Sequence, residues 1–215
     1  MLIDPGHNGG NADHPDEINQ LVPAGGFTKA CDTTGTSTAA GYSEAAFNLD
    51  VGLRLAALLR REGAHVVLTR TTNSGVGPCV DERAAIGNRA HADAAISIHA
   101  DGAPPSGQGF HVIEPQRVGG YNDRIVAPSA RLGRILRDEM AVGSGLVAST
   151  YLGHDGIDVR GDLGGLNLST VPKVFLESGN MRSAHDAALQ TDSAWRARLA
   201  QVIAAALTLY LTSPA

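Results

Sequence analysis

Residues 94–99 read Ala-Ala-Ile-Ser-Ile-His, and residues 171–177 read Val-Pro-Lys-Val-Phe-Leu-Glu. Each stretch is a short, mainly apolar run that ends on a polar side chain, which is typical of buried strands. Similar apolar runs predict further strands at residues 1–3, 65–69, 110–113 and 157–159. It predicts helices from Glu44 to a C-cap at Gly63, at residues 81–91 and 122–142, and one or two over 183–211. This alternation favours an α/β fold, a single-domain twisted, largely parallel β-sheet sandwiched by α-helices.

The composition is that of one globular domain. Of the 215 residues, 43% are hydrophobic and 18% are charged, which suffices for one full core. No internal repeat or linker is visible, so we expect a single domain over residues 1–215 and a monomer. The formal net charge of −5 and the lack of a run of Lys or Arg argue against a nucleic-acid partner.

Neither end of the sequence indicates a membrane segment. The longest apolar run, Val202–Leu211, is too short to span a bilayer and predicts a buried C-terminal helix. Residues 1–3 run directly into Asp4-Pro5-Gly6 without the pattern of a signal peptide. Two interpretations stay open at this point: a cytosolic protein, or one whose leader has been removed.

The two cysteines, Cys31 and Cys79, both lie in stretches rich in Gly, Thr and Pro. Such a pair suggests a disulfide and an oxidising compartment. Cys31 belongs to a long irregular segment, residues 8–43, in which residues 20–22 and 27–29 have the pattern of a hairpin. Loops of this length inside a compact domain are usually functional.

Four polar residues stand where predicted elements end or begin. His7 follows the first strand, His99 and Glu177 end two others, and Glu44 opens a helix. Because ligand sites in open α/β sheets form at the carboxyl ends of the strands, these side chains can converge. Two imidazoles and one carboxylate that leave a position open are typical of a catalytic zinc site, with a further carboxylate to move protons. The alternative is that the histidines are ordinary surface residues and that Glu44 only favours the helix dipole.

Several blocks of sequence resemble one known family. They are residues 2–10 (Leu-Ile-Asp-Pro-Gly-His-Asn-Gly-Gly), 41–44 (Gly-Tyr-Ser-Glu), 66–70 (Val-Val-Leu-Thr-Arg), 92–100 (Ala-Asp-Ala-Ala-Ile-Ser-Ile-His-Ala) and 171–179 (Val-Pro-Lys-Val-Phe-Leu-Glu-Ser-Gly). In this order and at these separations they are similar to the zinc-dependent N-acetylmuramoyl-L-alanine amidases of the Amidase_3 family. Family patterns differ at Asp101, where Asn is usual, and at Asn180–Met181, where Phe usually follows the Gly.

The resemblance implies a role for each of the four residues. His7, Glu44 and His99 are expected to be zinc ligands, and Glu177 is expected to be the catalytic carboxylate. The implied reaction is hydrolysis of the amide bond between muramic acid and L-alanine in peptidoglycan or in muropeptides. The resemblance also implies a periplasmic or extracellular location, with the signal peptide absent from this sequence. Other zinc peptidases or deacetylases, a non-catalytic cell-wall binding relative, and a structural domain with an incidental metal are the alternatives.

Other polar residues have plainer interpretations. Asp4 either orients His7 or is a turn residue, and Arg70 is expected to be a solvated strand-end residue. Glu114 is expected in a turn. The remaining histidines are expected at the surface or at helix ends: 14, 65, 91, 111, 154 and 185. For His14 and His111 the alternative is a place at the border of the groove. We expect residues 8–43 to wall the cleft, tethered by a Cys31–Cys79 disulfide, rather than to be an inert insertion.

Overall fold

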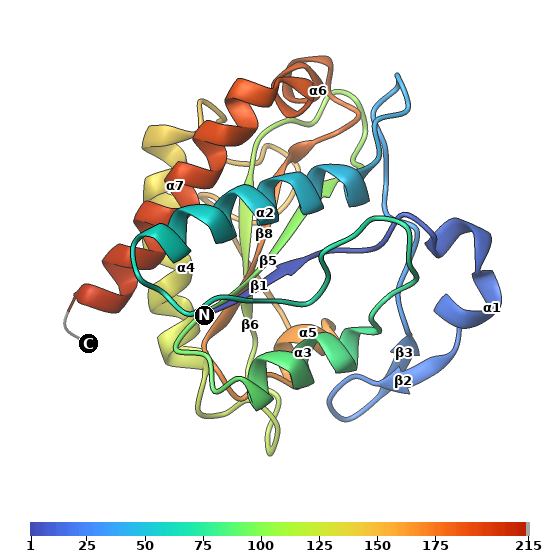
Figure 1. The fold of residues 1–215 in the computed structure, drawn as a ribbon, viewed down its shortest axis with the longest axis vertical. Helices are drawn as coiled ribbons and strands as arrows, with labels where there is room; N and C mark the ends of the chain where they lie inside the picture. The colour runs from blue at the N-terminus through green and yellow to red at the C-terminus, as the bar shows by residue number, and fades with distance from the viewer. Residues whose placement is uncertain (214–215) are drawn as a thin grey trace.

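A computed structural model describes residues 1–213 of the chain. The described residues form eight strands: β1 (Leu2–Pro5), β2 (Leu21–Pro23), β3 (Thr28–Ala30), β4 (Val67–Leu68), β5 (Ala95–Asp101), β6 (His111–Pro115), β7 (Ile157–Arg160) and β8 (Lys173–Asn180). The helices are α1 (Pro15–Ile18), α2 (Glu44–Arg61), α3 (Val80–Arg89), α4 (Val126–Gly143), α5 (Gly164–Asn167), α6 (Ala184–Thr191) and α7 (Ser193–Thr212), with a 3-10 turn at Asn11–Asp13. Figure 1 shows the sheet running through the middle of the molecule with helices on both sides.

Six strands form one sheet in the order β4-β1-β5-β8-β6-β7. Strands β4, β1, β5 and β8 run parallel, β6 pairs antiparallel with β8, and β7 runs parallel to β6. The expected twisted, largely parallel sheet between helices is therefore confirmed. The predicted hairpin is also present, as the separate two-stranded sheet β2-β3.

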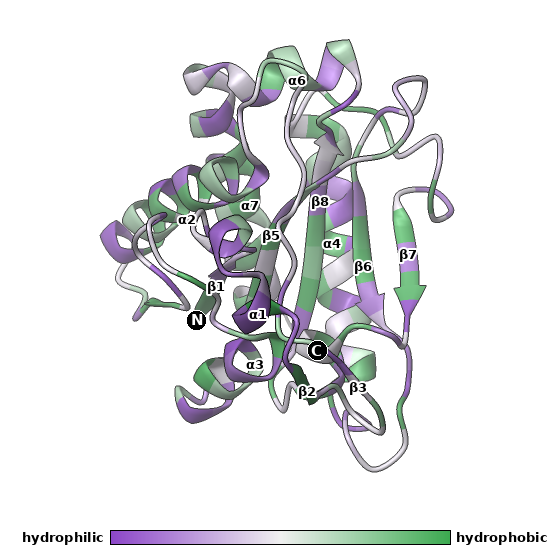
Figure 2. Ribbon diagram, turned by 90° about the vertical axis from the view of Figure 1, so that its right-hand side faces the viewer, coloured by the Kyte–Doolittle hydropathy of each residue, from purple (hydrophilic) through white to green (hydrophobic). Residues whose placement is uncertain are grey.

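The two faces of the sheet are covered differently. Helices α2, α4 and α7 pack on one face and form the main core with the inward residues of β5 and β8, such as Ile96, Ile98, Val174 and Leu176. Figure 2 shows β5, β8 and β6 side by side with α4 behind them. Helices α3 and α5 and the hairpin lie toward the other face. Because strand side chains alternate, Ser97, His99, Phe175 and Glu177 point to this second face.

Local signals explain where the elements begin and end. Ser43 caps α2 by accepting a hydrogen bond from the Ala46 amide (3.3 Å), and Gly63 follows the helix with a φ of +90°. The C-terminal helical region is two helices, because Asp192 accepts from the Ala194 amide (2.9 Å) and starts a new helix. Strands β5 and β8 continue two and three residues past His99 and Glu177, so these residues lie inside strands.

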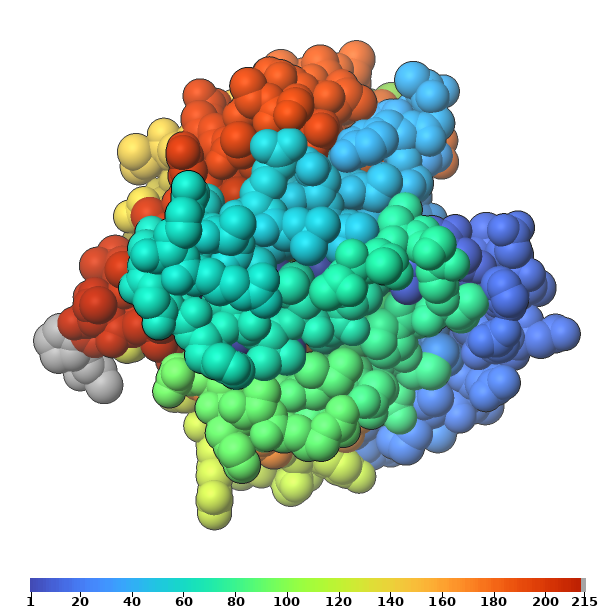
Figure 3. Space-filling model, in the orientation of Figure 1, coloured from blue at the N-terminus to red at the C-terminus, as the bar shows by residue number. Residues whose placement is uncertain are grey.

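A disulfide joins Cys31 to Cys79, as expected from the sequence. It fastens the segment after β3 to the start of α3, where the Val80 amide also donates to the Cys31 carbonyl (2.8 Å). Figure 3 shows the N-terminal segment, in blue, packed along the green segment of α3 and its preceding loop. Among the residues that the structure describes, none of the helices combines the length and the apolar character that crossing a membrane requires.

Candidate metal centre

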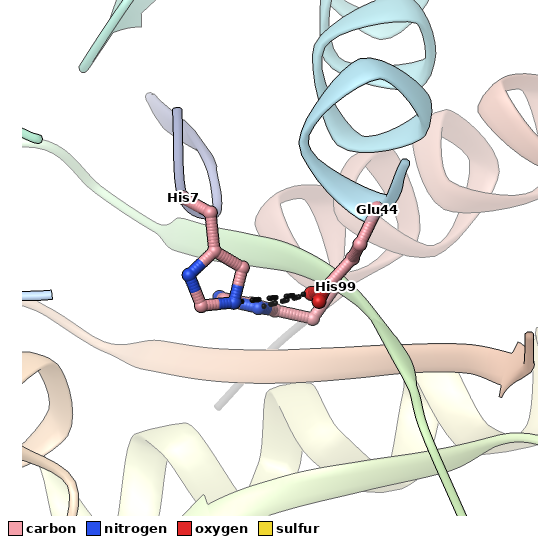
Figure 4. A group of neighbouring side chains, drawn as sticks. All are labelled: His7, Glu44 and His99. Carbon is pink, nitrogen blue, oxygen red and sulfur yellow. Dashed lines mark hydrogen bonds and ion pairs between the residues drawn. The ribbon is translucent and has the colours of Figure 1, made fainter. Parts of the chain in front are cut away.

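Three of the four residues singled out by the sequence meet at one point. The donor atoms of His7, Glu44 and His99 all lie within 4.8 Å of one another. Glu44 Oε1 lies 2.9 Å from His99 Nδ1 and 3.3 Å from His7 Nε2. Figure 4 shows the three side chains converging from the loop after β1, the first turn of α2 and β5. Two imidazole nitrogens and a carboxylate oxygen at such separations fit the donor set of a catalytic zinc ion.

The backbone before His7 allows the two imidazole rings to come close. A Cβ atom on Gly6 would lie 2.1 Å from Cε1 of His99, so only glycine fits beside that ring. His7 itself has a φ of +55°, in the left-handed region that non-glycine residues seldom adopt. The rings of His7 and His99 then meet edge to face, with centroids 4.9 Å apart.

A buried arginine on α3 holds the strained His7 loop in place. The guanidinium of Arg83 donates to the carbonyl oxygens of Pro5 (2.8 Å) and His7 (3.0 Å). It also binds the carboxylates of Asp4 (2.9 Å) and Asp32 (3.1 Å). Unpaired buried charges are costly, and here each charge has an opposite partner. Hydrogen bonds and ion pairs of Arg83 therefore fix the backbone around His7.

Asp32 is the side chain that orients His7. Its Oδ1 lies 2.9 Å from Nδ1 of His7, which leaves Nε2 to face Glu44 and His99. A carboxylate on the second nitrogen of a ligating histidine fixes the direction of the ring. Asp4, which the sequence offered for this role, instead binds Lys173 Nζ (2.9 Å) and Arg83 in the interior. Neither interpretation of Asp4, partner of His7 or turn residue, was right.

The charges around His7 decide its protonation in the metal-free protein. Burial lowers the pKa of His7, but the carboxylates of Glu44 and Asp32 outweigh burial and raise this pKa to about 10. The pKa of Glu44 moves the other way: burial raises it, and the neighbouring His7 and His99 lower it well below its usual value. A zinc ion would therefore displace a proton from this cluster on binding.

Glu177 lies beside this cluster without belonging to it. It pairs in register with His99 of β5 and with His111 of β6, so all three side chains stand on one face. Burial raises its pKa well above the usual value, and the charges of Glu44 and Asp101 raise it further. A carboxylate that holds a proton more tightly than usual can both accept and return one near neutral pH.

Three residues for which the sequence predicted a surface or turn position are buried. His111 is 1% exposed beside Glu177, its Nδ1 has no hydrogen-bond partner within residues 1–213, and burial lowers its pKa. Glu114, expected in a turn, is a buried residue of β6 that faces Gly133 of α4. Arg70, expected in solvent, is buried and donates to the carbonyl oxygens of Pro5, Gly6 and Ala45. In each case tertiary packing decides burial, which a local pattern does not record.

Two hollows meet at the centre, and both are lined by His7, Thr33, His99 and Glu177. The first, here called the hairpin cavity, measures about 250 Å³ and lies between the hairpin, α5 and the sheet. Its other lining residues include Lys29, Val80, Ile113, Arg160, Leu163 and Phe175. The second, the threonine pocket, is lined by Thr34, Thr36 and Asp101. Residues 29, 30, 32 and 33 line the hairpin cavity and residues 33–36 line the threonine pocket, so this part of the 8–43 segment walls the cleft as predicted.

Sequence reasoning missed the residues that support the centre. Asp32 directly follows Cys31 in the loop between two predicted ligands, and this position was the available signal. Lys173 interrupts an apolar strand, and a lysine in such a place needs a buried partner. Nothing in the sequence indicated that Arg83 is buried, because a charged residue on an amphipathic helix is usually solvated.

The comparisons with known proteins agree with the geometry. The chain matches the Amidase_3 family model, described as N-acetylmuramoyl-L-alanine amidase, over residues 1–209. It is 40% identical to an N-acetylmuramoyl-L-alanine amidase of Mycobacterium tuberculosis over 99% of this chain and 86% of the relative. The Ami1 amidase of Mycobacterium smegmatis is 39% identical, with a TM-score of 0.92 over 99% of this chain and 96% of that one. The apo form of Ami1 from Mycobacterium abscessus is also 39% identical, with a TM-score of 0.92 over 98% and 97%.

Proposed function

Since the chain belongs to the Amidase_3 family of N-acetylmuramoyl-L-alanine amidases, we propose that it is a zinc-dependent member. It hydrolyses the amide bond between the lactyl group of muramic acid and L-alanine, in peptidoglycan or its fragments. His7, Glu44 and His99 hold the zinc ion. The observation that carries the proposal is Glu177, a second carboxylate beside the cluster, in register with His99, whose raised pKa suits proton transfer.

The site residues divide the chemistry between them. When bound, zinc supplies a Lewis acid that polarises a carbonyl and makes a water molecule more acidic. Glu177 takes the proton from the attacking water and returns it to the leaving alanine nitrogen, because an amine leaves readily only when protonated. Asp32 keeps His7 in the orientation that binds metal, and Arg83 keeps the His7 loop in place.

We also propose an extracytoplasmic location and one catalytic domain over residues 1–215. The disulfide supports the location, because such bonds persist in oxidising compartments. The family match over residues 1–209 and the continuous core support the single domain.

Product analysis of a defined muramyl peptide tests the reaction. The zinc-loaded protein is expected to release a peptide that begins with alanine and an intact N-acetylmuramic acid, identified by mass spectrometry. Release of acetate or of a C-terminal residue would identify a different zinc hydrolase. No product at all, with zinc bound, would contradict the proposed activity.

The Glu177→Gln variant tests the role of the carboxylate. Gln keeps the shape of Glu177 but cannot accept the proton, so we expect unchanged zinc binding and a loss of kcat of about 10²–10⁴-fold. Zinc content is measured by metal analysis alongside kcat. The matched control is Glu82→Gln, an exposed glutamate paired with Arg89 on α3, which should leave both values unchanged. A fully active Glu177→Gln variant would show that another group moves the proton.

A further inference from the structure

Two buried polar side chains beside Glu177, those of His111 and Tyr151, have no role in the proposed function. His111 of β6 stands opposite Glu177 of β8, and Cβ atoms of such antiparallel partners lie about 4.5–5.5 Å apart. The Tyr151 ring meets the His111 ring edge to face, with centroids 6.0 Å apart. Nδ1 of His111 and the hydroxyl of Tyr151 are both buried, and neither completes a hydrogen bond within residues 1–213. Because buried polar atoms are seldom left unpaired, this pair calls for an explanation.

The phenol ring of Tyr151 is held firmly in place. Residues 147–150 run alongside residues 108–110 at the start of β6, and backbone hydrogen bonds of 2.7 to 3.0 Å join the two segments. The ring itself rests on Gly107, where a Cβ atom would lie 2.7 Å from its Cδ1. With the ring fixed between Gly107 and His111, only the hydroxyl hydrogen is free to turn.

The hydroxyl of Tyr151 lies among carboxylates. Burial raises the pKa of this hydroxyl, and the negative charges of Asp101, Glu177 and Asp186 raise it further. Two of these carboxylates, those of Asp101 and Asp186, already accept hydrogen bonds from backbone amides (2.9 and 2.7 Å). A phenol that keeps its proton is a hydrogen-bond donor, and a charged acceptor makes such a bond about twice as strong as a neutral one does.

We propose that Tyr151 is a positioning residue for Glu177, whose ionised carboxylate accepts a hydrogen bond from the Tyr151 hydroxyl. This inference rests on the proton-transfer role proposed for Glu177. The hydrogen bond holds one carboxylate oxygen and presents the other to the attacking water. Once Glu177 carries the proton, the hydroxyl turns to the carboxylate of Asp101. The phenol keeps its own proton throughout, so the proton that Glu177 took returns to the leaving nitrogen.

The Tyr151→Phe variant tests the proposal, because it removes only the hydroxyl. For the zinc-loaded protein acting on a muramyl peptide, we expect kcat to fall about tenfold or more. KM and zinc content should stay within about twofold, because the hydroxyl contacts neither substrate nor metal. The control is Tyr210→Phe on α7, which packs on the other face of the sheet and should leave all three values unchanged. A kcat for Tyr151→Phe within twofold of the unmodified protein would overturn the proposal.

Combined variants show whether Tyr151 acts through Glu177. In a Glu177→Gln background, Tyr151→Phe is expected to lower the remaining kcat by less than about twofold, because the carboxylate that it positions is gone. In an Asp101→Asn background the full loss of about tenfold should remain. A full loss that persists with Glu177→Gln would overturn the proposal. Disappearance of the loss with Asp101→Asn would assign the hydroxyl to Asp101 and would overturn it as well.

Thermal stability separates this proposal from the proposed function, because its measurement needs no turnover. Midpoints are compared for the zinc-loaded protein, Tyr151→Phe, Glu177→Met and the double variant, at a mildly alkaline pH that keeps Glu177 ionised. We expect Tyr151→Phe to lower the midpoint by roughly 2 °C or more, and to leave it unchanged or raise it in the Glu177→Met background. Equal shifts in the two backgrounds would overturn the proposal even in an active enzyme. An inactive protein that shows the expected difference would contradict only the proposed function.

Discussion

Gly6 and His7 show how single residues shape the centre. Gly6 is required because His99 occupies the space where a side chain would begin. His99 in turn stacks on Phe175, with ring centroids 5.2 Å apart, so its ring cannot retreat without losing this contact. The small size of Gly6 therefore sets the distance between the imidazoles of His7 and His99, the two proposed metal ligands.

We predict that Gly6→Ala weakens zinc binding by roughly tenfold or more. The new methyl group pushes the His99 ring away from His7. A shift of about 0.5 Å in a ligand position lowers the affinity of a metal site. Competition with a chromophoric chelator measures the affinity. Gly119→Ala is the control, because a Cβ atom there meets no atom within 4 Å. Zinc affinity equal to that of the unmodified protein would show that the loop adjusts freely.

The segment after β3 and helix α3 act together as one element of the site. Asp32, which orients His7, directly follows Cys31, and Arg83 lies one turn after Cys79, to whose carbonyl its amide donates (3.0 Å). The disulfide therefore joins the two pieces of chain that support His7. A covalent link at this place constrains the metal centre as well as the fold.

We predict that replacing both cysteines by alanine lowers stability and zinc affinity together. Loss of a native disulfide costs about 2–5 kcal/mol, measured here as a lower thermal midpoint. Zinc affinity at 25 °C, where circular dichroism shows the variant folded, is expected to fall about tenfold because Asp32 and Arg83 are less well placed. The comparison variant Asp32→Asn should lose affinity with a smaller loss of stability. Normal zinc affinity in the folded double-cysteine variant would show that the disulfide does not support the metal centre.

At the scale of the whole molecule, the metal centre links stability to pH. In the metal-free protein the raised pKa of His7 means that its stabilising charge is fully present below pH 6.5 and is lost as the pH rises toward 10. The lowered pKa of Glu44 means that its charge stabilises above pH 4.5. The pair therefore stabilises the metal-free fold most between these two values. If His7 holds zinc as proposed, it would be a neutral ligand in the zinc-loaded protein, and this dependence would disappear.

We predict that the thermal midpoint of the chelator-treated protein falls between pH 6 and pH 9. One pKa unit corresponds to about 1.4 kcal/mol, so a fall of roughly 3 °C or more is expected for a chain of this size. Calorimetry with and without zinc measures the midpoint, and zinc should raise it at both values. The fall should be smaller in Glu44→Gln, in which only Asp32 still raises the pKa of His7. Identical curves with chelator and with zinc would show that the protein binds no stabilising metal.

Much of the molecule follows from its sequence. Apolar runs such as residues 94–99 identify strands, and periodic runs such as the one after Glu44 identify helices, because these patterns report which side chains must leave water. Strands of an α/β fold also converge toward their carboxyl ends, which explains why His7 and His99 could be singled out, with Glu44 at the start of the following helix. Their roles as ligands, and that of Glu177, remain proposals.

Only the tertiary structure decided the surroundings of these residues. The antiparallel pairing of β6 puts His111 beside Glu177, and the docking of α3 brings Arg83 under the His7 loop. The hairpin likewise carries Lys29 to the rim of a cavity formed with β7 and α5. These contacts join residues tens of positions apart, and their energies depend on burial and on charged partners that a local pattern does not contain. The sequence alone determines which groups are present, whereas packing determines which of them act together.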